Sequence, residues 1–138
     1  MSTAAAAKQK VHRKDFVISL PENMAECVIT PLRKFTDDEF WQFCSSNREL
    51  RIEMTSEGQM MIMMPVGGEG SSRNFKLTGR FSAWVENNDS GIGFDSSGGF
   101  KLPNKAKRSP DAAWIKRERW EALSEQERQK LVPLCPDF

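Results

Sequence analysis

The spacing of apolar and polar residues predicts several short elements in the first half of the chain. A capping box at 36–39 precedes apolar residues at helical spacing, so we expect a short helix that ends around 45–47. Two strands are expected next, over 50–54 and 59–64, and the turn between them includes Gly58, which can take a positive φ. Methionine crowds the second strand, where filling a hydrophobic core is a more common use than copper binding.

A glycine-rich loop at 65–70 and a long helix follow. The loop lacks the Lys-Ser/Thr ending of a Walker motif, so it gives little support for nucleotide binding. Ser71 or Ser72 can cap the helix, and four of its apolar residues share one face that we expect to be buried. These four residues are Leu77, Phe81, Trp84 and Val85. Another side of the helix, which we expect to be solvated, carries Arg73, Lys76 and Arg80.

Short strands and helices are expected in the last third of the chain. The pattern predicts strands over 92–95 and 100–102, a buried central strand over 112–115, and helices over 117–123 and 124–131. The last helix begins with a second capping box. The order of helix, hairpin, long helix, strands and helices indicates an α+β (α/β-like) fold, with a mixed sheet flanked by helices.

Composition limits the class of protein. A length of 138 residues suits one domain, and a net charge of +1 excludes a strongly basic nucleic-acid coat while leaving room for a local basic patch. The longest nearly apolar run, 60–66, is much shorter than the roughly 20 residues of a membrane span. Three widely spaced cysteines favour reduced thiols in a cytoplasmic protein. The only histidine, His12, argues against a Ser-His-Asp or Cys-His site.

The sequence Ser-Pro-Asp at 109–111 stands directly before the expected buried strand. Because proline restricts the entry into the strand, the carboxylate of Asp111 is displayed at its beginning. Mg²⁺ prefers oxygen ligands and keeps several waters, so Asp111 is a candidate ligand. Hydrolysis of a phosphodiester needs a second acid and usually a cation near the phosphate. A local basic run just upstream consists of Lys105, Lys107 and Arg108.

Five stretches of the sequence together resemble a bacterial family of restriction-type endonucleases in the PD-(D/E)XK superfamily. The resemblance covers 35–138, about three quarters of the chain. The stretches that carry it are Thr-Asp-Asp-Glu-Phe-Trp at 36–41, Arg-Ile-Glu at 51–53 followed by Gly58, the Met-Pro and glycine loop at 64–70, Phe-Asp-Ser-Ser-Gly-Gly-Phe-Lys-Leu-Pro at 94–103, and Arg-Ser-Pro-Asp-Ala-Ala-Trp at 108–114.

This resemblance implies an αβββαβ-type nuclease core with its site at the Pro-Asp element. Asp111 is implied as a catalytic acid that binds Mg²⁺, and Glu53 as a second catalytic residue that faces the same site. The equally open alternative is that Glu53 is a strand-edge residue that forms a structural ion pair with Arg51 or a lysine. Asn74 is a weaker candidate, since relatives carry a polar residue at its place. Residues that could contact phosphate or line the site are Lys101, Lys107 and Arg108. DNA is the implied partner, and the need to reach two strands suggests a homodimer.

The second acid of the superfamily pattern stands two positions before a lysine, and this spacing is absent after Asp111. No lysine in the chain follows an acid in this way. In the family, the strand with that acid follows a lead-in similar to Cys-Pro-Asp-Phe, which occupies 135–138 here. We therefore expect 35–138 to be a truncated nuclease-like domain. Residues 1–34 are expected to be a partly flexible N-terminal extension with β-like stretches at 17–18 and 28–29.

Three functions stay open at this point. The first is an Mg²⁺-dependent DNA endonuclease, impaired because its second acid is missing. The second is a non-catalytic remnant that still binds DNA or dimerises. The third is an interaction module that uses an exposed sheet edge. Loss of one member of a two-carboxylate site is expected to weaken metal binding and to remove most of the rate.

Overall fold

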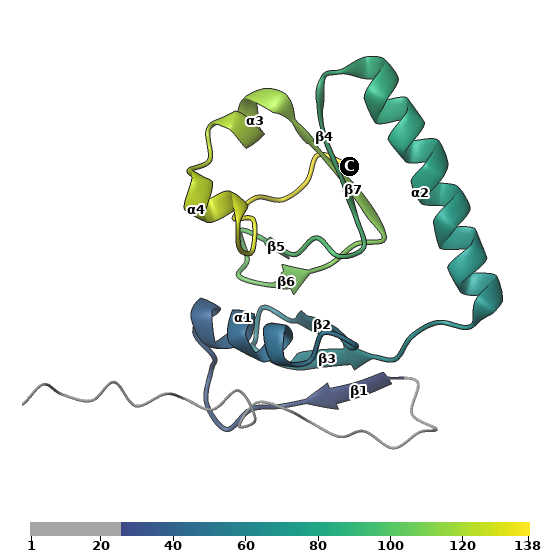
Figure 1. Ribbon diagram of the computed structural model, residues 1–138. Coiled ribbons are helices and arrows are strands. Elements are labelled where there is room, and N and C mark those ends of the chain that lie inside the picture. Colours follow the sequence, from purple (N-terminus) through teal and green to yellow (C-terminus); the bar gives the residue numbers. More distant parts are fainter. Residues whose placement is uncertain (1–25) are drawn as a thin grey trace, which may run out of the picture.

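A computed structural model of the chain describes residues 26–138. Within this part, helices and strands form an α+β arrangement, which confirms the predicted fold class (Figure 1). The expected mixed sheet is replaced by two sheets whose strand pairs are antiparallel. The elements in chain order are β1 (Glu26–Ile29), α1 (Asp37–Ser46), β2 (Arg51–Met54), β3 (Met60–Met63), α2 (Gly68–Asn88), β4 (Gly91–Asp95), β5 (Phe100–Lys101), β6 (Lys107–Arg108), β7 (Ala112–Lys116), α3 (Arg117–Glu121) and α4 (Glu125–Arg128).

Five of the described strands form one sheet in the order β1-β3-β2-β6-β5, and each of its neighbouring pairs is antiparallel. The hairpin of β2 and β3 is the one that the alternating pattern predicts. Its turn passes through Gly58, whose φ of 92° is a conformation that L side chains rarely adopt. The N–H of Gly58 donates to the carbonyl oxygen of Thr55 over 3.1 Å, which closes the turn.

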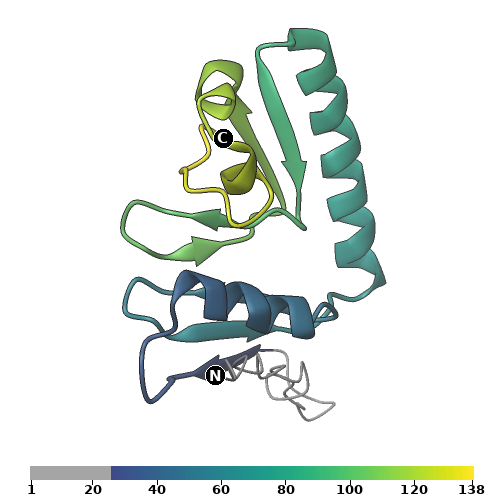
Figure 2. The same cartoon turned by 60° about the vertical axis from the view of Figure 1, so that its left-hand side comes forward.

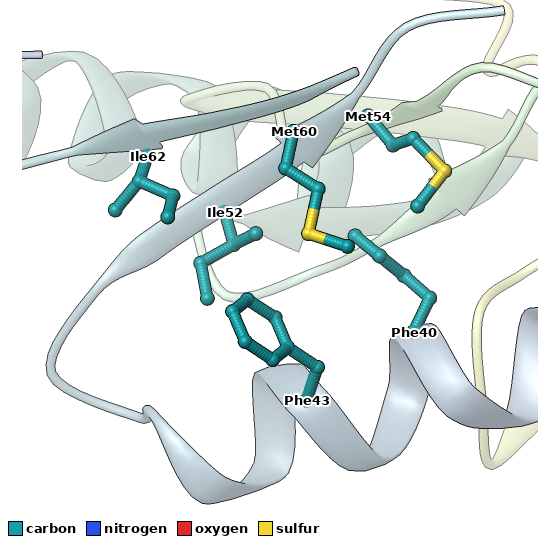
Figure 3. Close-up of a cluster of buried hydrophobic side chains, with 6 residues drawn as sticks. All are labelled: Phe40, Phe43, Ile52, Met54, Met60 and Ile62. Carbon is teal, nitrogen blue, oxygen red and sulfur yellow. The ribbon is translucent and has the colours of Figure 1, made fainter. Parts of the chain in front are cut away.

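Helix α1 covers one face of this sheet, as Figure 3 shows. The predicted capping box is present: Thr36 accepts from the backbone N–H of Glu39, and Glu39 accepts from the N–H of Thr36. Apolar side chains from the helix meet those of the hairpin in a cluster made of Phe40, Phe43, Ile52, Met54, Met60 and Ile62. The methionines at 54 and 60 therefore fill the core, as expected for residues with a flexible apolar side chain.

The opposite face of the same hairpin carries the residues that alternate with the core. In β2 the buried residues Ile52 and Met54 alternate with the partly buried Arg51 and Glu53. Because successive side chains of a strand point to opposite faces, Arg51 and Glu53 lie on the side of the sheet away from α1. We call this side the outer face of β2.

A second, two-stranded sheet pairs β4 with β7 in antiparallel register. The other edge of β7 meets the C-terminal segment, where the N–H of Trp114 donates to the carbonyl oxygen of Phe138 over 2.7 Å. Ala113 and Ile115 of β7 are fully buried, which confirms the expected buried strand, but β4 is the one described strand that pairs with β7, so β7 is not central in a sheet. They form a second core cluster together with Phe100 and Val132.

Helix α2 runs along one side of the molecule, next to β4 and β7 (Figures 1 and 2). It begins at Gly68, earlier than a cap at Ser71 or Ser72 would place it. The expectation that its apolar face is buried is wrong, since Leu77 is 48% exposed and Trp84 is 45% exposed. The physical reason is that only the narrow β4–β7 sheet packs against the helix. Phe81 and Trp84 stack on each other, with ring centroids 5.8 Å apart, and they also contact the rings of Phe138 and Trp114.

Other differences between prediction and structure are local. The capping box at Ser124 is present, but α4 ends at Arg128 rather than at 131. The two-residue strand β6 is absent from the prediction, and it matters for the site described next. The β-like stretch at 17–18 lies outside the described residues, whereas the one at 28–29 belongs to β1 and pairs with β3. Over 26–138 the helices are too short or too polar to cross a membrane.

Candidate active site

The candidate site is built on the outer face of β2. Glu53 lies beside Arg108 of the neighbouring strand β6, because the antiparallel register sets Met54 opposite Lys107. Nη1 of Arg108 donates to Oε2 of Glu53 over 3.2 Å. Oε1 of Glu53 lies 3.7 Å from Nη2 of Arg51. The Glu53 carboxylate therefore stands between two guanidinium groups.

The turn that leads from β6 into β7 docks on these side chains. The backbone N–H of Ser109 donates to Oε1 of Glu53 over 3.0 Å. The carbonyl oxygen of the same residue accepts from Nη2 of Arg51. Nη1 of Arg51 donates to Oδ1 of Asp111 over 2.8 Å. Two side chains of β2 thus bind both backbone polar groups of Ser109 and hold the Asp111 carboxylate at the start of β7.

The two carboxylates differ in their access to solvent. The Glu53 side chain is 12% exposed, whereas that of Asp111 is 42% exposed. A pocket of about 390 Å³ opens beside Glu53, between Arg108, Pro110 and the C-terminal segment. This pocket is lined by Glu53 and not by Asp111, so a small ligand in it would contact Glu53, whereas Asp111 is reached directly from the surface.

The oxygen atoms of Asp111 suit a hard divalent cation. Oδ1 accepts from Arg51, and no group in residues 26–138 donates to Oδ2. Both oxygens of Glu53 already accept hydrogen bonds. Mg²⁺ is usually held by one or two carboxylates, with waters completing the shell, so Asp111 fits as a ligand of this type. No cluster of three or more His, Cys, Asp or Glu residues suited to a metal occurs in the described part of the chain.

Some of the predicted site residues come together and others do not. Asp111, Glu53 and Arg108 meet on the outer face of β2. Lys101 and Lys107 lie on the side of α1 instead, where both pair with Asp37 of that helix. The separation of Lys107 from Arg108 follows from strand alternation, since neighbours in β6 point to opposite faces.

Lys107 is enclosed rather than available to a phosphate. It is 4% exposed, its Nζ lies 3.1 Å from Oδ1 of Asp37, and it stands 5.3 Å from the centre of the Phe40 ring. Burial raises the pKa of the Asp37 carboxyl, but hydrogen bonds from Lys101 and Lys107 outweigh that effect, so this pKa lies below its ordinary value. The lysines therefore join α1 to the β5–β6 hairpin.

Asn74 makes fewer contacts with the site than the sequence suggested, and Arg51 makes more. Asn74 is half-buried on α2, and no hydrogen bond within 26–138 joins it to Asp111 or Glu53. Arg51 was expected only as a partner of Glu53, yet it binds Asp111 and the Ser109 carbonyl as well. The available signal was its position two residues before Glu53, which places both side chains on one face of a strand.

One protein-family model matches the part of the chain that contains this site. The model of the Uma2 family, described as "Putative restriction endonuclease", matches residues 37–138. This range contains α1, the β2–β3 hairpin and every residue of the site described above. No curated protein matches the chain.

Proposed function

We propose that this chain, which belongs to the Uma2 family described as "Putative restriction endonuclease", is an Mg²⁺-dependent endonuclease that acts on DNA. The observation that carries the proposal is the Asp111 carboxylate, which is partly exposed and is held by Arg51 at the start of β7. It lies within the part of the chain that the family matches, next to a second acid and a second arginine.

Each of the chain's own residues has a distinct part in this proposal. Asp111 would hold the metal through Oδ2, since Oδ1 is bound to Arg51. A bound Mg²⁺ supplies an activated water and screens the charge of the phosphate. Arg108 is 37% exposed and uses Nη1 to bind Glu53, so its other N–H groups can donate to a phosphate oxygen. Glu53 orients Arg108 and the turn at Ser109.

A non-catalytic DNA-binding protein is the second candidate. The observation that favours it is that both carboxylates are already paired with arginines, so that the four charges of Arg51, Glu53, Arg108 and Asp111 cancel. A protein with this arrangement could use Arg108 to bind a phosphate backbone without cleaving it.

A plasmid cleavage assay tests the first proposal. Wild type and Asp111→Asn are incubated with supercoiled plasmid and Mg²⁺, with and without EDTA. Asp38→Asn is the matched control, because Asp38 is an exposed acid on α1 that pairs only with Lys130 in the described structure. We expect wild type and the control to nick DNA slowly and in a metal-dependent way, since no lysine after Asp111 follows an acid by two positions, and Asp111→Asn to lose this activity.

A failure of wild type to cleave any DNA with Mg²⁺ or Mn²⁺ would contradict the nuclease proposal. The second candidate then predicts retarded migration of DNA in a gel, which Arg108→Ala should reduce and which should weaken as salt is raised.

We also propose that the protein is a homodimer in the cytoplasm. A duplex has two strands to cut, and two copies of one site can address both. The three cysteines Cys27, Cys44 and Cys135 are all free thiols, which suits a reducing compartment. Light scattering that shows a monomer at the concentration of the cleavage assay would refute the dimer.

A further inference from the structure

We propose that Arg51 is the positioning residue of the metal ligand Asp111. The inference rests on the proposed function in one respect only, namely that Asp111 binds a divalent cation. Nothing in the resemblance of the sequence assigns this part to Arg51, which follows from the contacts that it makes across the fold.

The contacts of Arg51 form a closed ring with the turn before β7. Nη1 binds Oδ1 of Asp111 over 2.8 Å, and Nη2 binds the carbonyl oxygen of Ser109. The N–H of Ser109 returns to Glu53, two residues along the same strand from Arg51. One guanidinium therefore fixes the carboxylate and the backbone that carries it at the same time.

The geometry requires arginine and not only a positive charge. A guanidinium presents its N–H groups in a rigid planar fork, so Nη1 and Nη2 can bind two acceptors side by side. A lysine at position 51 would carry a single ammonium group and could not hold both acceptors in the same arrangement. Arg51→Lys is therefore expected to keep the charge while losing part of the positioning.

Positioning and electrostatics make opposite predictions for metal affinity. If Arg51 only supplied positive charge, it would compete with a cation for Asp111, and its removal would strengthen metal binding. If Arg51 aims the free Oδ2 by holding Oδ1, its removal weakens metal binding. Partners that orient a metal ligand typically contribute 10-fold to 100-fold in metal affinity or activity.

The test measures the binding of Mn²⁺ by isothermal titration calorimetry, with no DNA present. Arg51→Ala should bind Mn²⁺ about 10-fold to 100-fold more weakly than wild type, and Arg51→Lys should be intermediate. Arg117→Ala is the matched control, since Arg117 also pairs with an aspartate, Asp89, and is similarly exposed at 41% against 34% for Arg51. The control should bind Mn²⁺ as wild type does.

A purely structural role for Arg51 would lower the thermal midpoint without changing Mn²⁺ affinity in the folded protein. All titrations are therefore run well below the midpoint of the least stable variant. If Arg51→Ala does not fold, Arg51→Lys decides the matter by the same measure. Unchanged or tighter Mn²⁺ binding in the variants overturns the inference.

The failure of this inference is separable from the failure of the proposed function. Wild type that binds Mn²⁺ through Asp111 but cleaves no DNA would refute the nuclease while the positioning role of Arg51 stands. Wild type that cleaves DNA while the Arg51 variants bind Mn²⁺ normally would refute the positioning role alone. Absence of Mn²⁺ binding by wild type refutes the inference whatever the cleavage assay gives.

Discussion

Replacing Asp37 by alanine leaves Lys107 buried without its carboxylate. Lys107 is 4% exposed, and its other described neighbours are the sulfur of Met54 at 3.8 Å and the ring of Phe40 at 5.3 Å. Neither neighbour can balance a full positive charge. Asp37→Ala is therefore expected to destabilise the fold by more than the loss of an ordinary surface ion pair, which is worth about 0–1 kcal/mol.

The magnitude follows from the burial of the two partners. Breaking a buried ion pair by removing one partner typically costs about 3–5 kcal/mol. The Asp37 side chain is 49% exposed, so solvent screens part of the pair, and we expect the low end of that range. Lys107→Met should cost within about 1 kcal/mol, because Asp37 keeps Lys101 as a partner and methionine fills the volume of the lysine stem.

Urea unfolding followed by tryptophan fluorescence gives the free energy of unfolding for wild type, each single variant and the double variant. The double variant Asp37→Ala with Lys107→Met should recover most of the stability that Asp37→Ala loses, since it no longer contains a buried unpaired charge. The reasoning is refuted if Lys107→Met costs as much as Asp37→Ala, or if the double variant is no more stable than Asp37→Ala. A Lys107→Met protein that is stable but binds DNA poorly would return Lys107 to the DNA interface.

Three further predictions concern stability and thiol reactivity. Gly91→Ala should lower the free energy of unfolding by at least about 1–3 kcal/mol, because a Cβ there would stand 2.2 Å from a carbonyl oxygen of β7. Gly79→Ala lies in open space on α2 and should raise the free energy of unfolding by about 0.5–1 kcal/mol. Urea unfolding measures both changes. The hydrogen bond from Arg33 lowers the pKa of Glu39 to about 2. The stabilisation from Glu39 is therefore fully present above its unfolded pKa of 4.5 and is lost as the pH falls toward 2. The difference in thermal midpoint between wild type and Glu39→Gln should shrink over that pH range, and a constant difference would contradict the ion pair of Arg33 with Glu39 as the source of the stabilisation. Burial raises the pKa of Cys44 to about 11, so mass spectrometry should find Cys44 unmodified by iodoacetamide at pH 8 until the protein is denatured.

The parts of the fold that could be predicted from the sequence depend on residues close together in the chain. The start of α1 is fixed by a capping box within 36–39, and the β2–β3 hairpin by alternation around the turn at Gly58. The exposure of α2 could not be predicted, since the periodicity of its apolar residues is the same whether or not a second layer covers them. What decides their burial is the width of the sheet beside the helix, and that sheet has two strands in the described structure.

The candidate site likewise has one part that local sequence predicts and another that depends on residues far apart in the chain. Asp111 follows from its place after a proline at the start of a strand, which is a local feature. The contacts of Arg51 reach across 58 and 60 positions of sequence, to Ser109 and Asp111, and depend on the pairing of β2 with β6. Strand β6 has two residues and no apolar alternation of its own, so its position could not be predicted. For the same reason Lys107 and Arg108, neighbours in sequence, could not be assigned to opposite faces.

The core and the site are specified by one strand register. In β2 the residues Ile52 and Met54 face α1, while Arg51 and Glu53 face the turn before β7. A slip of one residue would expose the two apolar side chains and drive both charged ones into the core beneath α1. Burying unpaired charges is far more costly than exposing two apolar side chains, so the packing of α1 strongly selects the register that aims Arg51 at Asp111. The placement of Arg51 and Glu53 beside the turn that carries Asp111 is therefore tied to the hydrophobic core on the other side of the sheet.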